Sequence, residues 1–506
     1  MSAAKEPIQR RALKITVVGG ISFLTGSVLS FVSVPVFLHT WGSERYGAWL
    51  ALLAGFMLVR TIDSGYVLYV SNQLNVLYHE DRARMRRSLS SSLWVCVCLI
   101  ILETLACAGV MSSGKLNSLL GVSPADVGRY SLGAALGVLL LGNVLTGPHF
   151  GILNRLFIPL GMLYQATWWG VVIQVGLALG LLVPAMLGAS ILQAAVVYVL
   201  IQTACNVAFA VHLRRAAPEF APWWRRPDFK TGADDFLRSL LLTANGVGQQ
   251  ATTSGMVLFV SGVFGVASVP VFTTVRTLAN LWNAVSNLFA SPLWPEIVRF
   301  HATREHEKLF KAFHAHWFFS GLTVNASMIA ILPFVDHFYA TWTRGALPFE
   351  RSLFLCTLAS VSLANFGFAL NVYMLGINNL TAQLVTTAAR AGIVFGVAGV
   401  LFRWMGLRAI GISLLVAEVA CSVFLSVYFT NRELARFDAR LPRGSVGMAL
   451  LGTLPVQFLA IQSTLVGQIH TTSWFLAAAA LCFVAWLSWR RLDADVKSRA
   501  LLLLRR

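Results

Sequence analysis

Long apolar stretches separated by short basic segments dominate this chain and limit what it can fold into. A helix of about 20 apolar residues crosses the hydrocarbon core of a bilayer. About fourteen stretches qualify, at 15–38, 46–78, 90–112, 128–153, 156–184, 189–212, 236–262, 267–299, 313–338, 352–375, 380–402, 409–429, 446–466 and 472–489. Only 12% of the residues are charged, about half the fraction usual in soluble proteins. The sequence therefore predicts an all-α polytopic membrane protein.

The basic residues follow a one-sided pattern that orients these spans. If the N-terminus is cytoplasmic and the spans alternate, 29 of the 39 Lys and Arg residues fall in cytoplasmic segments and 7 in outer ones. Cytoplasmic loops are the ones that carry excess Lys and Arg. The split favours an even number of spans with both termini in the cytoplasm. It also explains the net charge of +18 without a nucleic-acid partner.

One basic connection, at 214–235, is longer than the other cytoplasmic segments. It contains Trp223, Trp224 and Arg225, and aromatic and basic residues of this kind lie at membrane–water interfaces. The connection separates six spans from the next six. We expect an N-terminal six-helix bundle at 1–213, an interfacial linker at 214–235, a second six-helix bundle at 236–430, and a helix pair with a basic tail at 431–506.

Three arginines, Arg60, Arg276 and Arg390, fall inside predicted spans. An arginine at the centre of a spanning helix costs about 2.5–3.5 kcal/mol on insertion scales, so it normally faces a polar cavity or another helix. Three such residues predict a cavity within the bilayer that is lined by positive charge. A cavity of this kind suits an anionic cargo.

Amide side chains accompany one of these arginines at helical spacing. Four residues in 267–299 recur at i, i+4, i+7 and i+11 and share one helix face: Arg276, Asn280, Asn283 and Asn287. A shorter stripe in 236–262 contains Asn245 and Gln249. Amides alone would suit hydrogen bonding between helices, worth about 0.6 kcal/mol per pair. The arginine favours substrate binding, because helix association does not require a full charge.

Acidic residues within the spans define candidate sites for a coupling ion. Asp63 follows Arg60 at i+3, close enough to form either a structural ion pair or a pair that opens when Asp63 binds a proton or cation. Glu418 lies in the middle of its span and is the second coupling candidate, whereas we expect Glu103 to be structural. Arg390 contacts either the cargo or Glu418. No cofactor is expected beyond a coupling H⁺ or Na⁺.

Four short segments resemble the polysaccharide flippases, the Wzx-type transporters of O-antigen and exopolysaccharide units in the MOP superfamily. Residues 41–49 read Trp-Gly-Ser-Glu-Arg-Tyr-Gly-Ala-Trp, and residues 62–66 read Ile-Asp-Ser-Gly-Tyr. They are similar to the family patterns Leu-Gly-x-x-x-Tyr-Gly-x-Trp and Leu-Asp-Leu-Gly-Leu, with Ser64 in place of the usual apolar residue. Residues 272–276 and 291–296 resemble the eighth helix of the family, which ends near Pro-Glu.

This resemblance implies a fold, a cargo and a location. The fold would be MATE-like and V-shaped, with two six-helix halves and a C-terminal helix pair. The pair exceeds the twelve spans of many O-antigen flippases, which leaves open a subfamily nearer the fourteen-span lipid II flippases. The cargo would be an undecaprenyl-pyrophosphate-linked oligosaccharide that crosses the bacterial inner membrane by alternating access. Partners would include membrane lipids and polysaccharide polymerase or assembly proteins.

Other classes of protein fit the sequence less well. A drug or cation antiporter of the same superfamily would favour an acidic cavity, whereas basic residues predominate here. A major-facilitator symporter would place glycines around the basic segment 81–87, and they are missing. A membrane enzyme of polysaccharide assembly, such as a polymerase or ligase, generally needs a large or acidic outer loop. The outer segments at 112–127 and 339–351 are short and poor in acids, so we expect no enzyme.

Overall fold

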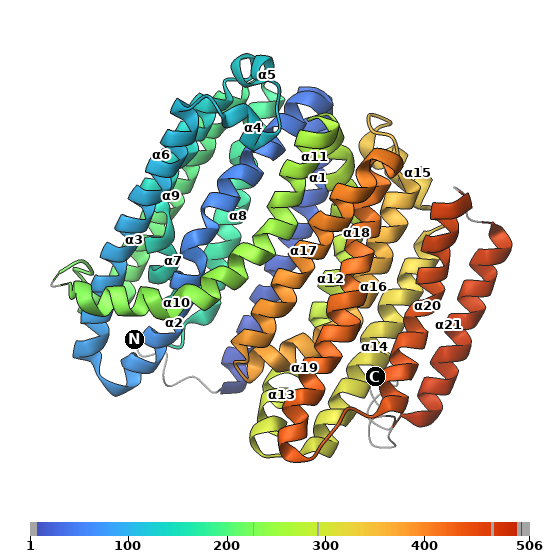
Figure 1. The fold of residues 1–506 in the computed structure, drawn as a ribbon. Coiled ribbons are helices and arrows are strands. Elements are labelled where there is room, and N and C mark those ends of the chain that lie inside the picture. Colours follow the sequence, from blue (N-terminus) through green and yellow to red (C-terminus); the bar gives the residue numbers. More distant parts are fainter. Residues whose placement is uncertain (1–7, 226, 291–292, 467–469, 493–496, 498–506) are drawn as a thin grey trace. The chain divides into compact units, whose positions relative to one another are not determined.

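The computed structural model describes residues 8–225, 227–290, 293–466, 470–492 and 497. Every regular element in these ranges is helical, which confirms the all-α fold. The chain forms two compact units, Met1–Pro270 and Val271–Arg506, and each is described by itself (Figure 1). The expected six-helix bundles at 1–213 and 236–430 remain a prediction.

The described residues of the first unit form eleven α-helices and two short helical segments of other types. They are α1 (Ile8–Val59), α2 (Thr61–Glu80), α3 (Arg82–Ser112), α4 (Leu116–Leu120), α5 (Pro124–Arg129), α6 (Leu132–Thr146), α7 (Pro148–Arg155), α8 (Leu163–Met186), α9 (Ile191–Ala216), η2 (Pro218–Phe220), α10 (Phe229–Gln250), η3 (Ala251–Gly255) and α11 (Met256–Phe264). Helix α8 packs against both α1 and α9, and α10 packs along α2. In Figure 1, α10 lies crosswise to α3, α6 and α9.

One apolar cluster fixes where α2 lies in the first unit. It buries Tyr66 and Val70 of α2 against Phe157 and against Phe209 of α9, with further residues from α3 and α7. The rings of Phe157 and Phe209 meet edge to face at 5.8 Å, a favoured aromatic arrangement. The cluster therefore holds the start of α2, where Asp63 lies, beside α7 and α9.

The chain reverses inside the segment assigned to α1. Gly42 has φ 71° and ψ 175°, so two helices are joined there rather than one long helix. A positive φ is costly for residues with a side chain beyond Cα, which explains the glycine after Trp41. Trp41 Nε1 donates to the Ala189 carbonyl at 3.0 Å, and Phe37 stacks on Tyr46 at 5.1 Å. The Trp-Gly…Tyr-Gly segment therefore forms the turn between the first two predicted spans.

The second unit is built around one central helix. Its elements are α12 (Ser268–Ala290), α13 (Leu293–Ala302), α14 (His306–Ile331), α15 (Val335–Thr343), α16 (Arg351–Gly376), α17 (Leu380–Met405), α18 (Arg408–Glu418), η4 (Val419–Leu425), α19 (Ser426–Leu434), η5 (Ala435–Phe437), α20 (Arg443–Val466) and α21 (Thr471–Arg491). Helix α16 packs against α14, α18 and α20 and is almost wholly buried. Trp317 Nε1 donates to the Phe366 carbonyl at 2.9 Å and ties α14 to α16.

Ten helices of the described residues are long and apolar enough to cross a membrane, or eleven if the bent pair α14 and α15 forms one span. The ten include both α20 and α21, the predicted C-terminal pair. The full count of fourteen is not confirmed. Three predicted spans do not stand as separate apolar helices. Span 46–78 is divided between α1 and α2, 236–262 is divided between α10, η3 and α11, and 267–299 contains the amphipathic helix α12. These are the spans with Arg60, the Asn245 stripe and Arg276.

The connection between α9 and α10 is shorter than expected, because α9 continues to Ala216 and α10 begins at Phe229. Trp94 Nε1 donates to the Trp224 carbonyl at 3.1 Å, which ties the connection to α3. Asp228 caps α10 by accepting hydrogen bonds from the backbone of Lys230 and Thr231. The Thr231 hydroxyl also donates to Asp228 Oδ2, at 2.6 Å, and this bond together with the backbone donors holds the pKa of Asp228 below its ordinary value.

Candidate functional site

A polar cavity of about 370 Å³ lies within the first unit, beside the break between α1 and α2. Its polar lining comes from α2, α7 and α9 and includes Arg60, Asp63, Ser64, Asn154, Gln202 and Asn206. The remaining wall is largely apolar, with Val67, Phe150 and Phe209. A cation, a carboxylate and three amides thus share one cavity, an arrangement that can bind charged and hydroxyl-bearing groups. Arg60 and Asp63 were expected from the sequence, whereas the amides were not.

Arg60 and Asp63 do not form the expected ion pair. Within the described part of the chain, no salt bridge or hydrogen bond joins them. Asp63 is buried, and neither its Oδ2 nor Arg60 Nε has a hydrogen-bond partner there. The Arg60 guanidinium instead lies over the Phe56 ring, 5.5 Å from its centroid. The i, i+3 rule assumes a continuous helix, and the helix is interrupted at Arg60, which precedes the first residue of α2.

A close helix crossing positions Asp63. A Cβ atom on Gly65 would lie 2.2 Å from the backbone nitrogen of Thr243 in α10, so only glycine permits this approach of α2 to α10. Ser64 Oγ lies beside the same crossing and donates to the Thr61 carbonyl at 2.7 Å. The Asp-Ser-Gly segment therefore serves two purposes: the glycine allows the contact, and the preceding residues reach the cavity.

A second buried carboxyl lies in the same unit. Glu103 of α3 is 1% exposed and accepts a hydrogen bond from Asn143 Nδ2 of α6 at 3.0 Å. Its Oε1 has no hydrogen-bond partner among the described residues. Glu103 and Asp63 lie near enough for their charges to interact. The first unit therefore buries both of these acids, Asp63 and Glu103.

The predicted stripe on α12 forms a ladder along one helix face. Asn283 Nδ2 donates to Asn280 Oδ1 at 3.0 Å, and Asn287 Nδ2 donates to the Asn283 carbonyl at 2.9 Å. Arg276 heads the ladder, with its guanidinium 5.0 Å from the Phe272 ring centroid. Asn280 and Asn287 are exposed, and Asn283 is half-buried. One bond thus joins the side chains of Asn280 and Asn283, and the other holds the Asn287 amide on a backbone carbonyl.

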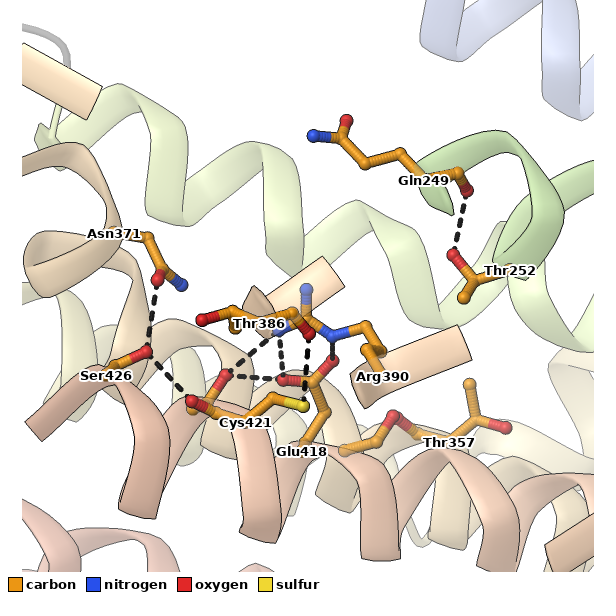
Figure 2. Close-up of polar contacts among 11 residues, drawn as sticks. Gln249, Thr252, Thr357, Asn371, Thr386, Arg390, Glu418, Cys421 and Ser426 are labelled. Carbon is orange, nitrogen blue, oxygen red and sulfur yellow. Dashed lines mark hydrogen bonds and ion pairs between the residues drawn. The ribbon is translucent and has the colours of Figure 1, made fainter. Parts of the chain in front are cut away.

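The shorter stripe, in the first unit, lies where α10 gives way to a π-helix. Gln249 is exposed and Asn245 is half-buried. The Gln249 carbonyl accepts a hydrogen bond from Thr252 Oγ1 at 2.8 Å (Figure 2). The π-helix η3 follows directly at Ala251–Gly255, and π-helical segments occur frequently at functional sites.

Arg390 and Glu418 form an ion pair between α17 and α18, one of the two contacts that the sequence left open for Arg390. Arg390 Nη2 donates to Glu418 Oε2 at 3.1 Å, and Arg390 Nε lies 2.9 Å from Oε1 (Figure 2). The side chains are only 23% and 14% exposed. Buried charges of opposite sign at this distance offset the cost of removing each from water. In this conformation Arg390 is engaged by Glu418.

Hydroxyl groups extend the ion pair into a polar seam inside the second unit. Ser422 Oγ donates to Glu418 Oε2, and Arg390 Nη2 approaches Ser422 Oγ at 3.5 Å. Ser426 Oγ lies 3.0 Å from Asn371 Oδ1 of α16 and 2.9 Å from the Cys421 carbonyl. Residues 419–425 are π-helical, as in the first unit. Sequence reasoning missed these hydroxyls, although their spacing of four residues from Glu418 was visible.

The described helices place the chain among polytopic membrane proteins with two helical units, and comparison with solved structures narrows that class. No family model and no curated protein matches the sequence. An inward-facing multidrug resistance MATE transporter of the MOP superfamily aligns with TM-score 0.63 and 15% identity over 81% of this chain and 95% of that one. The lipid II flippase MurJ, in an inward closed conformation, aligns with TM-score 0.62 and 11% identity over 96% and 100%. The fold is the one that MATE transporters and MurJ share.

Proposed function

We propose that this protein is a flippase that moves an undecaprenyl-pyrophosphate-linked oligosaccharide across the bacterial inner membrane by alternating access. One observation carries the choice of cargo class. The MurJ alignment covers 96% of this chain, whereas the MATE structures cover 81–86%. The lipid II flippase therefore aligns with nearly the whole chain at a similar TM-score, 0.62 against 0.58–0.63 for these MATE structures. The O-antigen or exopolysaccharide repeat is the oligosaccharide that the Wzx-like segments favour.

Such a cargo carries a pyrophosphate, sugars and a long lipid. Guanidinium groups bind phosphate oxygens through paired N–H donors, and amides bind sugar hydroxyls. In the first unit, Arg60 lies in a cavity that also contains Asn154, Gln202 and Asn206. Both kinds of recognition are thus available within one cavity. Asn245 and Gln249 on α10 are proposed to add to the sugar contacts.

Arg276 and its amide ladder are proposed as the second set of cargo contacts. Arg276 would bind pyrophosphate, and Asn280, Asn283 and Asn287 would bind the sugars that follow it. The ladder suits a linear oligosaccharide because its members repeat along one helix face with ordered amides. Arg390 can join them only when its pair with Glu418 opens.

Asp63 and Glu418 are proposed as the ion-coupling residues, with H⁺ or Na⁺ as the coupling ion. Binding of a proton or cation to Glu418 would release Arg390 for the cargo, because the carboxylate could no longer attract it fully. We place both termini in the cytoplasm, on the distribution of basic residues. A polysaccharide polymerase or other assembly protein would receive the flipped unit.

The test is complementation of a strain whose own repeat-unit flippase is deleted. Arg276→Ala should reduce surface polysaccharide by about tenfold or more, the loss expected when charge-assisted hydrogen bonds to a phosphate are removed. Lipid-linked repeat units should accumulate on the inner face. Arg403→Ala is the matched control, since Arg403 is exposed at the end of α17. Normal polysaccharide in Arg276→Ala, at matched protein level, would contradict the proposal.

A MATE-type antiporter is the second candidate, favoured by the MATE structures and by the buried acids of the first unit. It predicts export of cationic drugs that depends on Asp63 and not on Arg276. If Asp63→Asn abolishes drug resistance while Arg276→Ala leaves it intact, the antiporter replaces the flippase. A polymerase or ligase would instead leave repeat units unlinked on the outer face when the protein is deleted.

A further inference from the structure

A second cavity, of about 330 Å³, lies wholly within the second unit and apart from the residues discussed so far. It forms where α14 ends and α16 and α21 begin. Helices α14 and α15 meet at 74° around Pro333, so α15 turns away from the direction of α14. This turn brings Asp336, in the first turn of α15, to Arg351, the first residue of α16. The charged side of the cavity is therefore formed by the N-terminal ends of α15 and α16.

The charged side is accessible and electrically balanced. Arg351 Nη2 donates to Asp336 Oδ2, and the side chains are 34% and 43% exposed. This bond uses one nitrogen of Arg351, whose guanidinium carries five N–H donors. Because Arg351 and Asp336 are both partly exposed, each can bind a ligand group of opposite charge. Neither has to break a fully buried ion pair to do so. His470 and Thr471 complete the polar side.

The rest of the cavity lining is apolar and aromatic. Trp474 Nε1 donates to the Ile329 carbonyl at 2.8 Å, which fixes the indole as a wall. Phe475 and Leu476 on the same helix are 61% and 65% exposed, and Phe334 is 66% exposed. Exposed apolar side chains at the start of a membrane-length helix contact lipid chains, and tryptophan concentrates at the level of the headgroups. The cavity thus joins a polar side to a lipid-facing surface.

We propose that this cavity binds the headgroup of a phospholipid that carries both a phosphate and a primary ammonium, as in phosphatidylethanolamine. The phosphate would bind Arg351 and the ammonium would bind Asp336, with the acyl chains along Phe475 and Phe334. The cavity pairs one positive with one negative group, which matches a headgroup of zero net charge. An anionic headgroup leaves Asp336 unmatched, and a quaternary ammonium has no N–H to donate. This site does not depend on the proposed cargo.

The test measures lipid retention by the purified full-length protein, using native mass spectrometry with dioleoyl lipids at equal concentration. The wild type should retain phosphatidylethanolamine about tenfold more than phosphatidylglycerol or phosphatidylcholine, as charge-assisted hydrogen bonds imply. Asp336→Asn should invert the order of the first two lipids, because it removes the ammonium partner and leaves Arg351 for the anionic headgroup. Arg351→Gln should lose the binding of both.

Arg408→Gln is the matched control, because Arg408 is an exposed arginine of the same unit that does not line the cavity. It should retain the wild-type order. Arg351→Lys keeps the positive charge and should retain phosphatidylethanolamine, and thermal unfolding without added lipid checks that each variant is folded. An unchanged ratio of the two lipids in folded Asp336→Asn overturns the proposal. Wild-type retention in folded Arg351→Gln overturns it as well.

Discussion

Arg60 and Arg390, two arginines of the predicted spans, each have a carboxylate nearby in sequence or on the next helix, and the two combinations differ in the structure. In the second unit, Arg390 and Glu418 come from adjacent helices and are joined at 2.9–3.1 Å. In the first unit, Arg60 and Asp63 are three residues apart, and neither a salt bridge nor a hydrogen bond joins them in the described chain. Sequence proximity therefore does not decide which charges neutralise each other.

This difference indicates different roles for the Arg390–Glu418 pair and for Arg60 and Asp63. A closed pair holds two helices together and withholds its charge from a ligand. Charges that line a cavity of about 370 Å³ without such a bond remain able to bind one. We infer that Arg60 in the first unit can bind an anion directly. Arg390 in the second unit can do so only after its ion pair with Glu418 has broken. The predictions below test this contrast.

Glu418→Gln should have the largest effect on stability. Removing one partner of a buried ion pair leaves the other charge uncompensated, at a cost of about 3–5 kcal/mol in the free energy of unfolding. Asp63→Asn is the matched change in the first unit. It should be neutral or stabilising, because a buried carboxylate without an ion partner is itself unfavourable. Denaturation of the purified protein in detergent, titrated with SDS, measures both.

A double variant separates the pair from its surroundings. Arg390→Met with Glu418→Leu removes both charges and should recover most of the stability lost in Glu418→Gln, because apolar replacement of a buried pair is often neutral. Equal losses in Glu418→Gln and Asp63→Asn would remove the contrast between the units.

The sequence predicts the helical class and most of the apolar spans, because their length and composition decide them. It fails where polar residues interrupt a helix. Arg60 ends one helix, and the span at 236–262 is divided by the π-helix η3. Pairing rules for a continuous helix cannot anticipate such breaks. These helix breaks lie next to the cavity or the polar stripes. Such local departures from regular helix are expected at functional sites.

The sequence could have predicted the partner of Arg390 to within one helical turn. Helices α17 and α18 form a hairpin about Gly406, and Ser422 lies as far after that glycine as Arg390 lies before it. Ser422 does contact Arg390, at 3.5 Å, and Glu418 reaches the same guanidinium from one turn away. The π-helix that begins at Val419 shifts the register, and no pattern in the apolar residues indicates it.

Gly65→Ala should have the next largest effect, because the crossing of α2 and α10 holds Asp63 beside the cavity. The new methyl group would lie 2.2 Å from the Thr243 nitrogen and 2.4 Å from its Cα, which are backbone atoms that cannot rotate away. Forcing helices apart in this way costs about 1–3 kcal/mol. The same denaturation assay measures the loss.

Gly137→Ala in α6 is the control for this change. A Cβ at Gly137 meets no atom within 4 Å, and alanine favours a helix, so stability should stay equal or rise by up to about 1 kcal/mol. Equal behaviour of the two variants would show that the crossing does not position the first-unit acid, and the contrast between the units would then need another cause.

Ser422→Ala should have the smallest effect and probes how much of the second pair depends on its hydroxyl neighbour. Ser422 is fully buried, donates to Glu418 Oε2 and lies 3.5 Å from Arg390 Nη2, so its loss should cost about 1 kcal/mol. Ser64→Ala is the counterpart in the first unit. Among the residues that the structure describes, its hydroxyl donates to the Thr61 carbonyl one turn away, a local bond that the exposed side chain can exchange for solvent. A larger loss of unfolding free energy in Ser64→Ala than in Ser422→Ala would contradict this contrast. It would mean that Arg60 and Asp63 depend on an ordered hydrogen-bond network and that the Arg390–Glu418 pair does not need Ser422.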